Sequence, residues 1–412
     1  MKGISAIFFP FLVSIVFMQA LSCKTDGKQP AGGSRFSGGT GAPVRVGIES
    51  DWEDVSAGFQ HTCGIRKGGS LWCWGRNSEG QAGNGAFENV YAPAEIGEGV
   101  AWDGAGLGDY WTCGVAKDNS LWCWGSHVNG SAREDKKTAN AVPERLALKS
   151  GNLSEIKFLD IAPGDGHVCG LAVGGKIYCW GAPRRLGRSG EEYGKEPAEI
   201  DASNVNAPKE FTDLSVGSGP PCGLTGDGRA FCWGRNDFGQ TGTGTFSENV
   251  DIPTAVLIED IAGSKIFSRI AAGTFHACAI MDDGAAYCWG KNGNGQLGCG
   301  DTSDRAKPVK VAAGGLKGSK EFIVVSAGFS HTCGITKDNL ALCWGEVFTG
   351  KTCNGYKDPN CLAPITIKIE GAKGESGFRF VSAGTSHSCL IAVGGALYCW
   401  GNNEDGRLGT GL

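Results

Sequence analysis

One spacing recurs seven times in this chain of 412 residues: a glycine, four residues, a cysteine, nine residues and then Cys-Trp-Gly. Successive copies begin 50 to 56 residues apart. Self-similarity at this period is typical of propellers, solenoids and repeat arrays, in which each unit buries its apolar surface against its neighbours. The paired cysteines are Cys63 and Cys73, Cys113 and Cys123, Cys169 and Cys179, Cys222 and Cys232, Cys278 and Cys288, Cys333 and Cys343, and Cys389 and Cys399.

The nine residues between each pair of cysteines are predicted to form two strands joined by a three-residue turn. The third turn residue is always Gly or Asn, as in Gly69 and Asn339. Both residue types tolerate positive φ, which this kind of hairpin loop requires at that place. The resulting register places Cys333 opposite Cys343, with Cα atoms about 4.5–5.5 Å apart, within reach of a disulfide. We therefore predict seven disulfides inside hairpins rather than zinc sites, which would need four ligands brought together.

Aromatic residues and histidines also keep fixed places in the repeat. Each second cysteine is followed by a tryptophan, and the alternation along that strand gives two apolar faces, as in a sheet packed between two neighbours. Five of the six histidines stand two residues before the first cysteine. We predict that each binds the backbone of its own repeat and that none holds a metal. They are His61, His167, His276, His331 and His387.

A proline-containing segment follows six of the seven hairpins but not the last one. A matching segment, Ala42-Pro43-Val44-Arg45-Val46, lies near the N-terminus instead. Proline suits an outer edge strand, because it removes a backbone donor. We therefore predict that the N-terminal strand completes the last sheet and closes a ring, which protects the sheet edges.

Several copies continue beyond Trp-Gly into Asn-x-x-Gly-Gln-x-Gly, as in residues 77–83, 236–242 and 292–298. With Ala327-Gly328-x-x-His331 upstream, this pattern resembles the RCC1-like (regulator of chromosome condensation) repeat. The resemblance covers residues 43–412 and implies an all-β fold, a seven-bladed β-propeller of four-stranded blades. The pattern is blurred at residues 126–141, 182–196 and 346–362, where we expect this chain to differ from its relatives.

The N-terminal residues indicate export. Residues 1–22 have a charged start, an apolar run and small residues before Cys23, as in a secretory signal. We predict that Cys23 carries a lipid, that residues 23–42 form a flexible Gly/Ser-rich tether, and that residues 43–412 form the propeller. The protein would then be anchored to the bacterial cell envelope, in the periplasm or at the surface. Export would permit the disulfides, including a further predicted bridge between Cys353 and Cys361. Cys299 is left as either a thiol or one half of an intermolecular bridge.

The remaining patterns suggest no catalytic, metal or cofactor site. The net charge of −5 gives no basic excess for binding nucleic acid. Residues 345–352 match the P-loop expression, but turn residues follow where a helix is required. We therefore expect no cofactor.

The leading hypothesis is a monomeric, non-enzymatic scaffold that binds a protein or envelope component. One alternative is an extracytoplasmic enzyme, a lyase or glycan hydrolase, with its site at the channel mouth. Another is a structural or adhesion component of the envelope. The loops between the repeat glycine and the first cysteine offer aromatic residues as binding candidates. These are Phe59, Tyr110, Trp111, Phe275 and Phe329.

Overall fold

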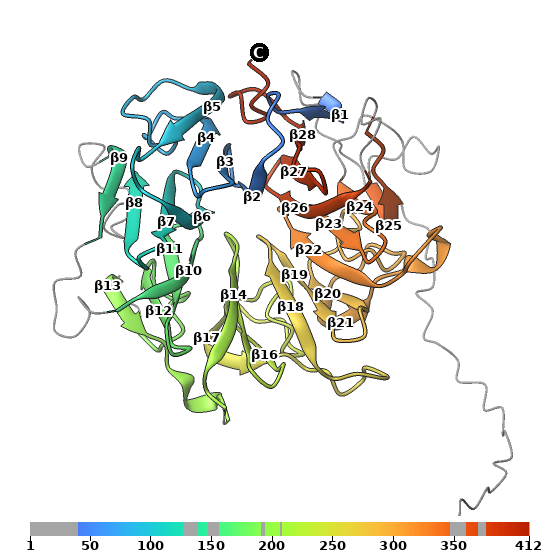
Figure 1. Cartoon of the computed structure of the whole chain (residues 1–412). Coiled ribbons are helices and arrows are strands. Elements are labelled where there is room, and N and C mark those ends of the chain that lie inside the picture. Colours follow the sequence, from blue (N-terminus) through green and yellow to red (C-terminus); the bar gives the residue numbers. More distant parts are fainter. Residues whose placement is uncertain are drawn as a thin grey trace, which may run out of the picture.

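Seven four-stranded antiparallel sheets are arranged as blades around a central channel (Figure 1). The computed structural model describes residues 40–126, 139–146, 156–190, 194–206, 208–346, 360–369 and 376–411. Two short 3-10 helices lie in the connections, η3 (Ala202–Asn204) and η4 (Ala313–Gly315). The predicted all-β, seven-bladed β-propeller is confirmed.

Each blade contributes one strand to each of four concentric positions. The innermost strands are β2 (Trp52–Ala57), β6 (Trp102–Leu107), β10 (Phe158–Pro163), β14 (Phe211–Val216), β18 (Phe267–Ala272), β22 (Phe322–Ala327) and β26 (Phe378–Ala383). The second strands are β3 (His61–Arg66), β7 (Trp111–Ala116), β11 (His167–Ala172), β15 (Pro221–Thr225), β19 (His276–Met281), β23 (His331–Thr336) and β27 (His387–Ala392). The third strands are β4 (Leu71–Gly75), β8 (Leu121–Gly125), β12 (Ile177–Gly181), β16 (Ala230–Arg235), β20 (Ala286–Gly290), β24 (Ala341–Glu346) and β28 (Leu397–Gly401). The outer strands are β5 (Val90–Ile96), β9 (Asn140–Arg145), β13 (Gly194–Glu199), β17 (Asn249–Ala255), β21 (Arg305–Lys310), β25 (Asn360–Thr366) and β1 (Thr40–Arg45).

Blades are numbered 1 to 7 in the order of their innermost strands, from β2 to β26. Blade 7 combines β26, β27 and β28 with β1 from the other end of the chain (Figure 1). Val44 lies opposite Cys399, and the Val46 amide donates to the Leu397 carbonyl at 2.9 Å. The predicted closure by the N-terminal strand is thus present.

The hairpin between the second and third strands has the predicted register in every blade. Cys333 lies opposite Cys343, and the amide of Thr336 donates to the carbonyl of Leu340 at 3.0 Å. The third turn residue has positive φ in all seven blades, from 61° at Asn339 to 92° at Gly69. The turn chemistry therefore sets the pairing of the two strands, as predicted.

All seven predicted hairpin disulfides are formed. They join Cys63 to Cys73, Cys113 to Cys123, Cys169 to Cys179, Cys222 to Cys232, Cys278 to Cys288, Cys333 to Cys343, and Cys389 to Cys399. One detail of the prediction is wrong, because the Cα–Cα distances are 4.0 to 4.2 Å and not 4.5–5.5 Å. Hydrogen-bonded and non-hydrogen-bonded pairs alternate along an antiparallel ladder, and counting from Thr336 and Leu340 puts the cysteines at a non-hydrogen-bonded pair. Strands approach most closely at such pairs, which accounts for the shorter distance.

The tryptophan of each third strand fills the space between neighbouring blades. Trp124 is fully buried, and its ring lies edge-on to Trp102 with centroids 5.8 Å apart. Its Nε1 donates to the carbonyl of Gln81 in blade 1 at 2.9 Å. These tryptophans therefore belong to the core, as predicted, and their polar atom joins one blade to the next.

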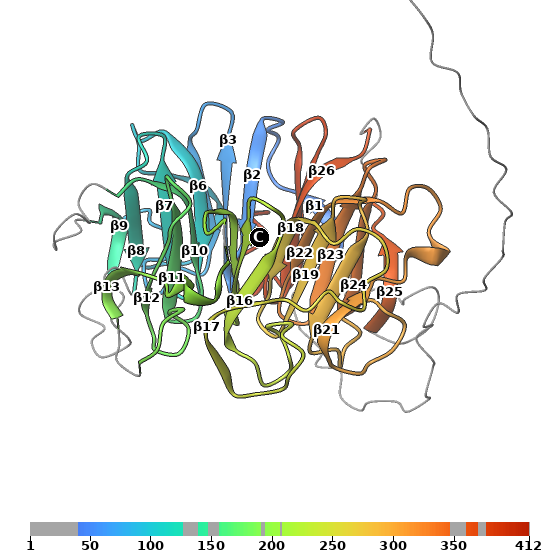
Figure 2. The same cartoon turned by 90° about the horizontal axis from the view of Figure 1, so that it is seen from below.

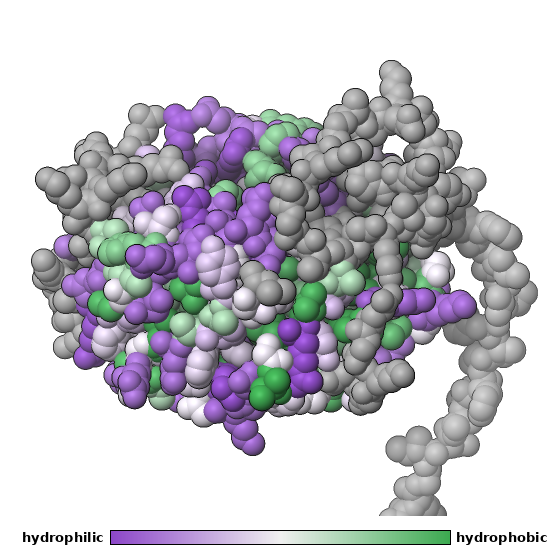
Figure 3. Space-filling model, turned by 90° about the horizontal axis from the view of Figure 1, so that it is seen from above, coloured by the Kyte–Doolittle hydropathy of each residue, from purple (hydrophilic) through white to green (hydrophobic). Residues whose placement is uncertain are grey.

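The outer strands form the rim of a flat disc (Figure 2). Each outer strand contains the predicted proline, as Pro308 does in β21. Where described residues are visible on the rim in Figure 3, hydrophilic and hydrophobic side chains are interspersed. This mixed surface is consistent with an outer face exposed to water.

Some predictions concern residues outside the described ranges. These are the signal at residues 1–22, Cys23 and most of the tether, as well as the bridge that involves Cys353. Cys299 is a buried thiol, and its Sγ lies 3.4 Å from Oδ1 of Asp301. In the described part of the chain, no helix has the length and apolar character needed to span a membrane.

Candidate functional site

The two faces of the disc carry different connections. The innermost strand of each blade leads into a short loop, residues 58–60 in blade 1, and the third strand leads into a longer one, residues 76–89. In an antiparallel sheet both connections emerge on the same side. We call this side the long-loop face, and the opposite side, which carries the hairpin turns, the turn face.

A ring of seven glycines surrounds the channel at the long-loop face. A Cβ added to Gly273 would lie 2.4 Å from the carbonyl oxygen of Gly328, and one added to Gly328 would lie 2.4 Å from that of Gly384. The backbone of each blade therefore touches the next blade where a side chain would otherwise begin. The amide of Phe329 continues the ring by donating to the Gly384 carbonyl at 3.3 Å. The close approach of neighbouring blades thus accounts for the glycine at this position of the repeat.

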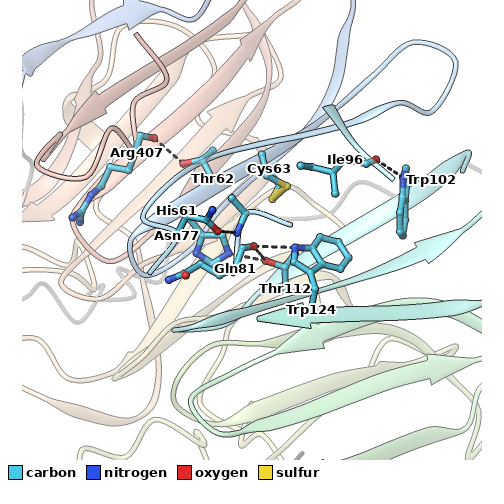
Figure 4. Close-up of a disulfide and its surroundings, with 12 residues drawn as sticks. His61, Thr62, Cys63, Asn77, Gln81, Ile96, Trp102, Thr112, Trp124 and Arg407 are labelled. Atoms are coloured by element: carbon cyan, nitrogen blue, oxygen red, sulfur yellow. Dashed lines mark hydrogen bonds between the residues drawn. A yellow bond between two sulfur atoms is a disulfide. The ribbon is translucent and has the colours of Figure 1, made fainter. Parts of the chain in front are cut away.

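Four of the five repeat histidines join neighbouring blades, which corrects for these four the prediction that they bind the backbone of their own blade. Nε2 of His61 lies 2.8 Å from the Thr112 hydroxyl of blade 2 (Figure 4). The Thr112 hydroxyl donates to the carbonyl of Gln81, which also accepts a hydrogen bond from Nε1 of Trp124. The hydroxyl is a better partner than a backbone carbonyl because it can donate and accept. The same arrangement joins His276 to Thr332, His331 to Ser388 and His387 to Thr62.

The seam between blades 3 and 4 departs from this arrangement. Blade 4 has Pro221 where Thr112 stands in blade 2, so no hydroxyl faces His167. Nε2 of His167 is buried without a hydrogen-bond partner, and Nδ1 lies 3.4 Å from the carbonyl of Asp165. Burial lowers the pKa of His167 to about 3, with Arg185 lowering it further, so the ring is neutral at physiological pH.

Thr332→Val tests the energetic role of these seams. The substitution keeps the side-chain shape but leaves Nε2 of His276 and the carbonyl of Gln296 without the hydroxyl, so we expect a loss of about 2 kcal/mol of stability. Denaturant unfolding would measure it, with the outer-strand change Thr254→Val as the control. A loss for Thr332→Val no greater than for the control would show that the seam bond is not stabilising.

The channel has a volume of about 300 Å³ and is lined by the innermost strands. Asp54, Asp160 and Asp213 occupy the same register position in blades 1, 3 and 4. Burial raises the pKa of Asp160 to about 6, and Asp213 and Asp54 raise it further. No group of His, Cys, Asp and Glu in the described ranges could hold a metal ion. The repeat histidines lie in the seams and not in the channel lining.

The aromatic loop candidates differ in how deeply they are buried. Phe59, Tyr110, Phe275 and Phe329 are half-buried on the long-loop face. Trp111 is 1% exposed, and its Nε1 donates to the carbonyl of Gly164 at 3.2 Å. Trp111 fills the seam position that a histidine takes in other blades, so its ring belongs to the packing between blades, unlike the four half-buried candidates.

Cationic side chains cover these aromatic rings. The guanidinium of Arg76 lies 5.5 Å from the centroid of Tyr110 in the next blade, and that of Arg235 lies 5.4 Å from the centroid of Phe275. Lys291 Nζ lies 4.8 Å from the same Phe275 ring. Cations held over aromatic faces are ordered at small entropic cost, which suits a binding surface.

A pocket of about 720 Å³ lies on the same face between blades 2 and 4. It arises because the blade 3 loop, residues 181–187, is two residues shorter than its counterpart at residues 75–83. Arg184 takes the place of Gly80 and keeps its left-handed conformation, with φ of 64°. A residue with a Cβ in this region costs about 1 kcal/mol or more, so the shortened loop holds Arg184 at some energetic cost.

The pocket contains three arginines, each close to a carboxylate. Arg184 pairs with Glu248, Arg185 with Asp165 and Arg235 with Asp237. The sequence suggested that this loop diverges but did not suggest these cations. The missing signal was the shortened loop combined with two consecutive arginines. The lining residues are Asp109, Tyr110, Trp111, Asp165, Gly166, Ala182, Pro183, Arg184, Arg185, Arg235, Asp237, Glu248 and Asn249.

The glycine ring, the seam bonds and the blade order define a seven-bladed propeller built from one repeat. The RCC1-like domain profile matches residues 105–412, and the RCC1 repeat profile matches residues 52–81. The chain belongs to the RCC1-like family.

Known proteins share this fold over most of its length. The ultraviolet-B receptor UVR8 of Arabidopsis thaliana is 30% identical over 258 residues, which are 62% of this chain and 56% of that protein. The match thus spans little more than half of that relative. The structure of human WBSCR16 superposes with a TM-score of 0.70 at 18% identity, covering 88% of this chain and 89% of that chain. Prp20p of Saccharomyces cerevisiae, described with its binding to Gsp1p and histones, superposes with a TM-score of 0.67 at 20% identity, covering 86% and 84%.

Proposed function

We propose that this protein is an exported, lipid-anchored and non-enzymatic scaffold that binds a protein or envelope partner through its long-loop face. The observation that carries the proposal is the pocket between blades 2 and 4, which lies where the repeat loop is shortened. Aromatic residues covered by cations flank this pocket at Tyr110 and Arg235. Pockets and ordered aromatic side chains are the usual anchors of protein interfaces.

Two further observations support parts of the proposal. The seven disulfides suit an oxidising compartment outside the cytosol, which supports export. The binding of Gsp1p and histones by Prp20p supports a macromolecular partner for the same fold. The lipid at Cys23 would be tested by mass spectrometry of the purified full-length protein, with Cys23→Ser as control.

Binding would be tested by capture on the immobilised full chain from envelope extracts. The double change Phe275→Ala and Phe329→Ala removes two half-buried rings from the long-loop face. Its control is Val173→Ala with Val393→Ala, two exposed residues of the hairpin turns. We expect the first variant to capture at least about tenfold less of the binder than wild type, while the control captures as much as wild type. Equal capture by both variants would place binding away from Phe275 and Phe329.

A further inference from the structure

Three phenylalanines from consecutive blades meet on the long-loop face. The Phe275 centroid lies 5.0 Å from Phe329 and 5.6 Å from Phe238, and both ring pairs are edge-to-face. We call these three residues the phenylalanine cluster. All three are half-buried, so the cluster offers apolar surface to a partner as well as packing between blades.

Lys291 lies over this cluster with a defined position. Its Nζ is 4.9 Å from the centroid of Phe238 and 4.8 Å from that of Phe275. Two rings therefore hold one ammonium group, and the lysine is itself half-buried. This long side chain is therefore already ordered in the free protein, so it loses little conformational entropy when a partner binds.

Lys291 is not neutralised by a carboxylate of the described residues, unlike most cations around it. Arg235 pairs with Asp237 next to the cluster, and Arg184 pairs with Glu248. Lys291 has no ion pair there, and its backbone amide donates to the carbonyl of Phe275. A half-buried cation without a counter-ion leaves electrostatic energy that a complementary charge can recover.

Resting on the proposed function, we propose that the partner places a carboxylate against Lys291 and an apolar side chain against the phenylalanine cluster. The partner is thus a protein segment in which acidic and apolar residues are neighbours. A carboxylate fits the uncompensated ammonium, and an apolar side chain fits the ring edges beside it. Because the protein carries a net charge of −5, this local cation would also orient an acidic segment that the rest of the surface repels.

The test uses the full chain and a blocked hexapeptide, Gly-Glu-Phe-Glu-Phe-Gly. Two further peptides have both Glu residues replaced, one by Gln and the other by Lys. Fluorescence anisotropy would measure each affinity for wild type, Lys291→Met, Lys291→Arg and the control Lys310→Met. Lys310 is an exposed lysine of the outer strand in the same blade. Thermal unfolding would verify that each variant is folded.

We expect the Glu peptide to bind at least about tenfold more tightly than the Gln or Lys peptide, and Lys291→Met to remove that difference. Lys291→Arg should restore most of it, Lys310→Met should leave it unchanged, and added salt should weaken it. Equal affinities for the Glu and Gln peptides, or no effect of Lys291→Met, would overturn the inference. If the phenylalanine double variant still lost its binder in the capture experiment, the proposed function would stand without the acidic partner. If capture were also unaffected, the acidic partner and binding at the phenylalanines would both be ruled out.

Discussion

Gly328→Ala is expected to destabilise the propeller by about 3 kcal/mol or more, one of the two largest effects predicted here. The added Cβ would lie 2.4 Å from the carbonyl oxygen of Gly384 and 2.9 Å from Cε1 of His331. Neither atom can move freely, because one is backbone of the next blade and the other belongs to a buried seam histidine. Denaturant unfolding under oxidising conditions would measure the loss.

Gly293→Ala is the matched control for this change. Gly293 lies on the same face, and nothing stands within 4 Å of the position its Cβ would take. We expect its stability to stay within about 0.5 kcal/mol of wild type. Similar losses for both variants would mean that the glycine ring is not set by contact between blades.

Acidification should be the second large effect, because five buried histidines must be neutral in the folded chain. Burial lowers the pKa of His61, His167 and His276 to about 3 and that of His331 to about 4, and it also lowers the pKa of His387. An unfolded histidine has a pKa of about 6.5. Below pH 6.5 the unfolded chain therefore binds protons that the folded chain does not, so stability falls as pH falls. Each histidine contributes a slope of about 1.4 kcal/mol per pH unit until its folded pKa is reached.

Three aspartates of the innermost strands act in the opposite direction. Burial raises the pKa of Asp160 to about 6 and also raises the pKa of Asp54 and Asp213. Below those folded pKa values the folded chain takes up protons before the unfolded chain does, which adds stability as pH falls. We therefore expect stability to fall progressively as the pH drops below about 6.5, with the carboxylates reducing the slope below about pH 6. Unfolding midpoints measured from pH 7 to pH 4 would show this loss of stability. His276→Asn removes one histidine, so it should reduce the slope by about 1.4 kcal/mol per pH unit. A flat profile would contradict the neutral seam histidines.

The fold could be predicted from sequence because local chemistry and repetition agree. The residues at the third turn position, such as Gly69 and Asn339, set the hairpin register, and that register places the cysteines opposite each other. The single proline segment near the N-terminus then indicated ring closure. Each step depends on contacts within one blade or on counting repeats, which sequence spacing describes directly.

The candidate site could be predicted only in part, because it depends on contacts between blades. Thr112 is 51 residues from His61, and no local pattern links them. The loop position of Trp111 suggests a binding residue, whereas its place at the histidine position of the repeat indicates the seam. The positions of Lys291 and Arg235 over Phe275 depend on how adjacent blades are rotated, which only the three-dimensional structure gives.

The pairing of β1 with β28 has a consequence for the order of assembly. Six blades are each made from one continuous stretch of chain, whereas blade 7 pairs Val44 with Cys399. During synthesis the first six can fold as they emerge, but β1 has no sheet to join until nearly the whole chain exists. Bringing such distant segments together carries the loop-closure entropy of a long chain and makes it intrinsically slow. We therefore expect completion of the circle to be the final event in folding, with the N-terminal strand unpaired until then.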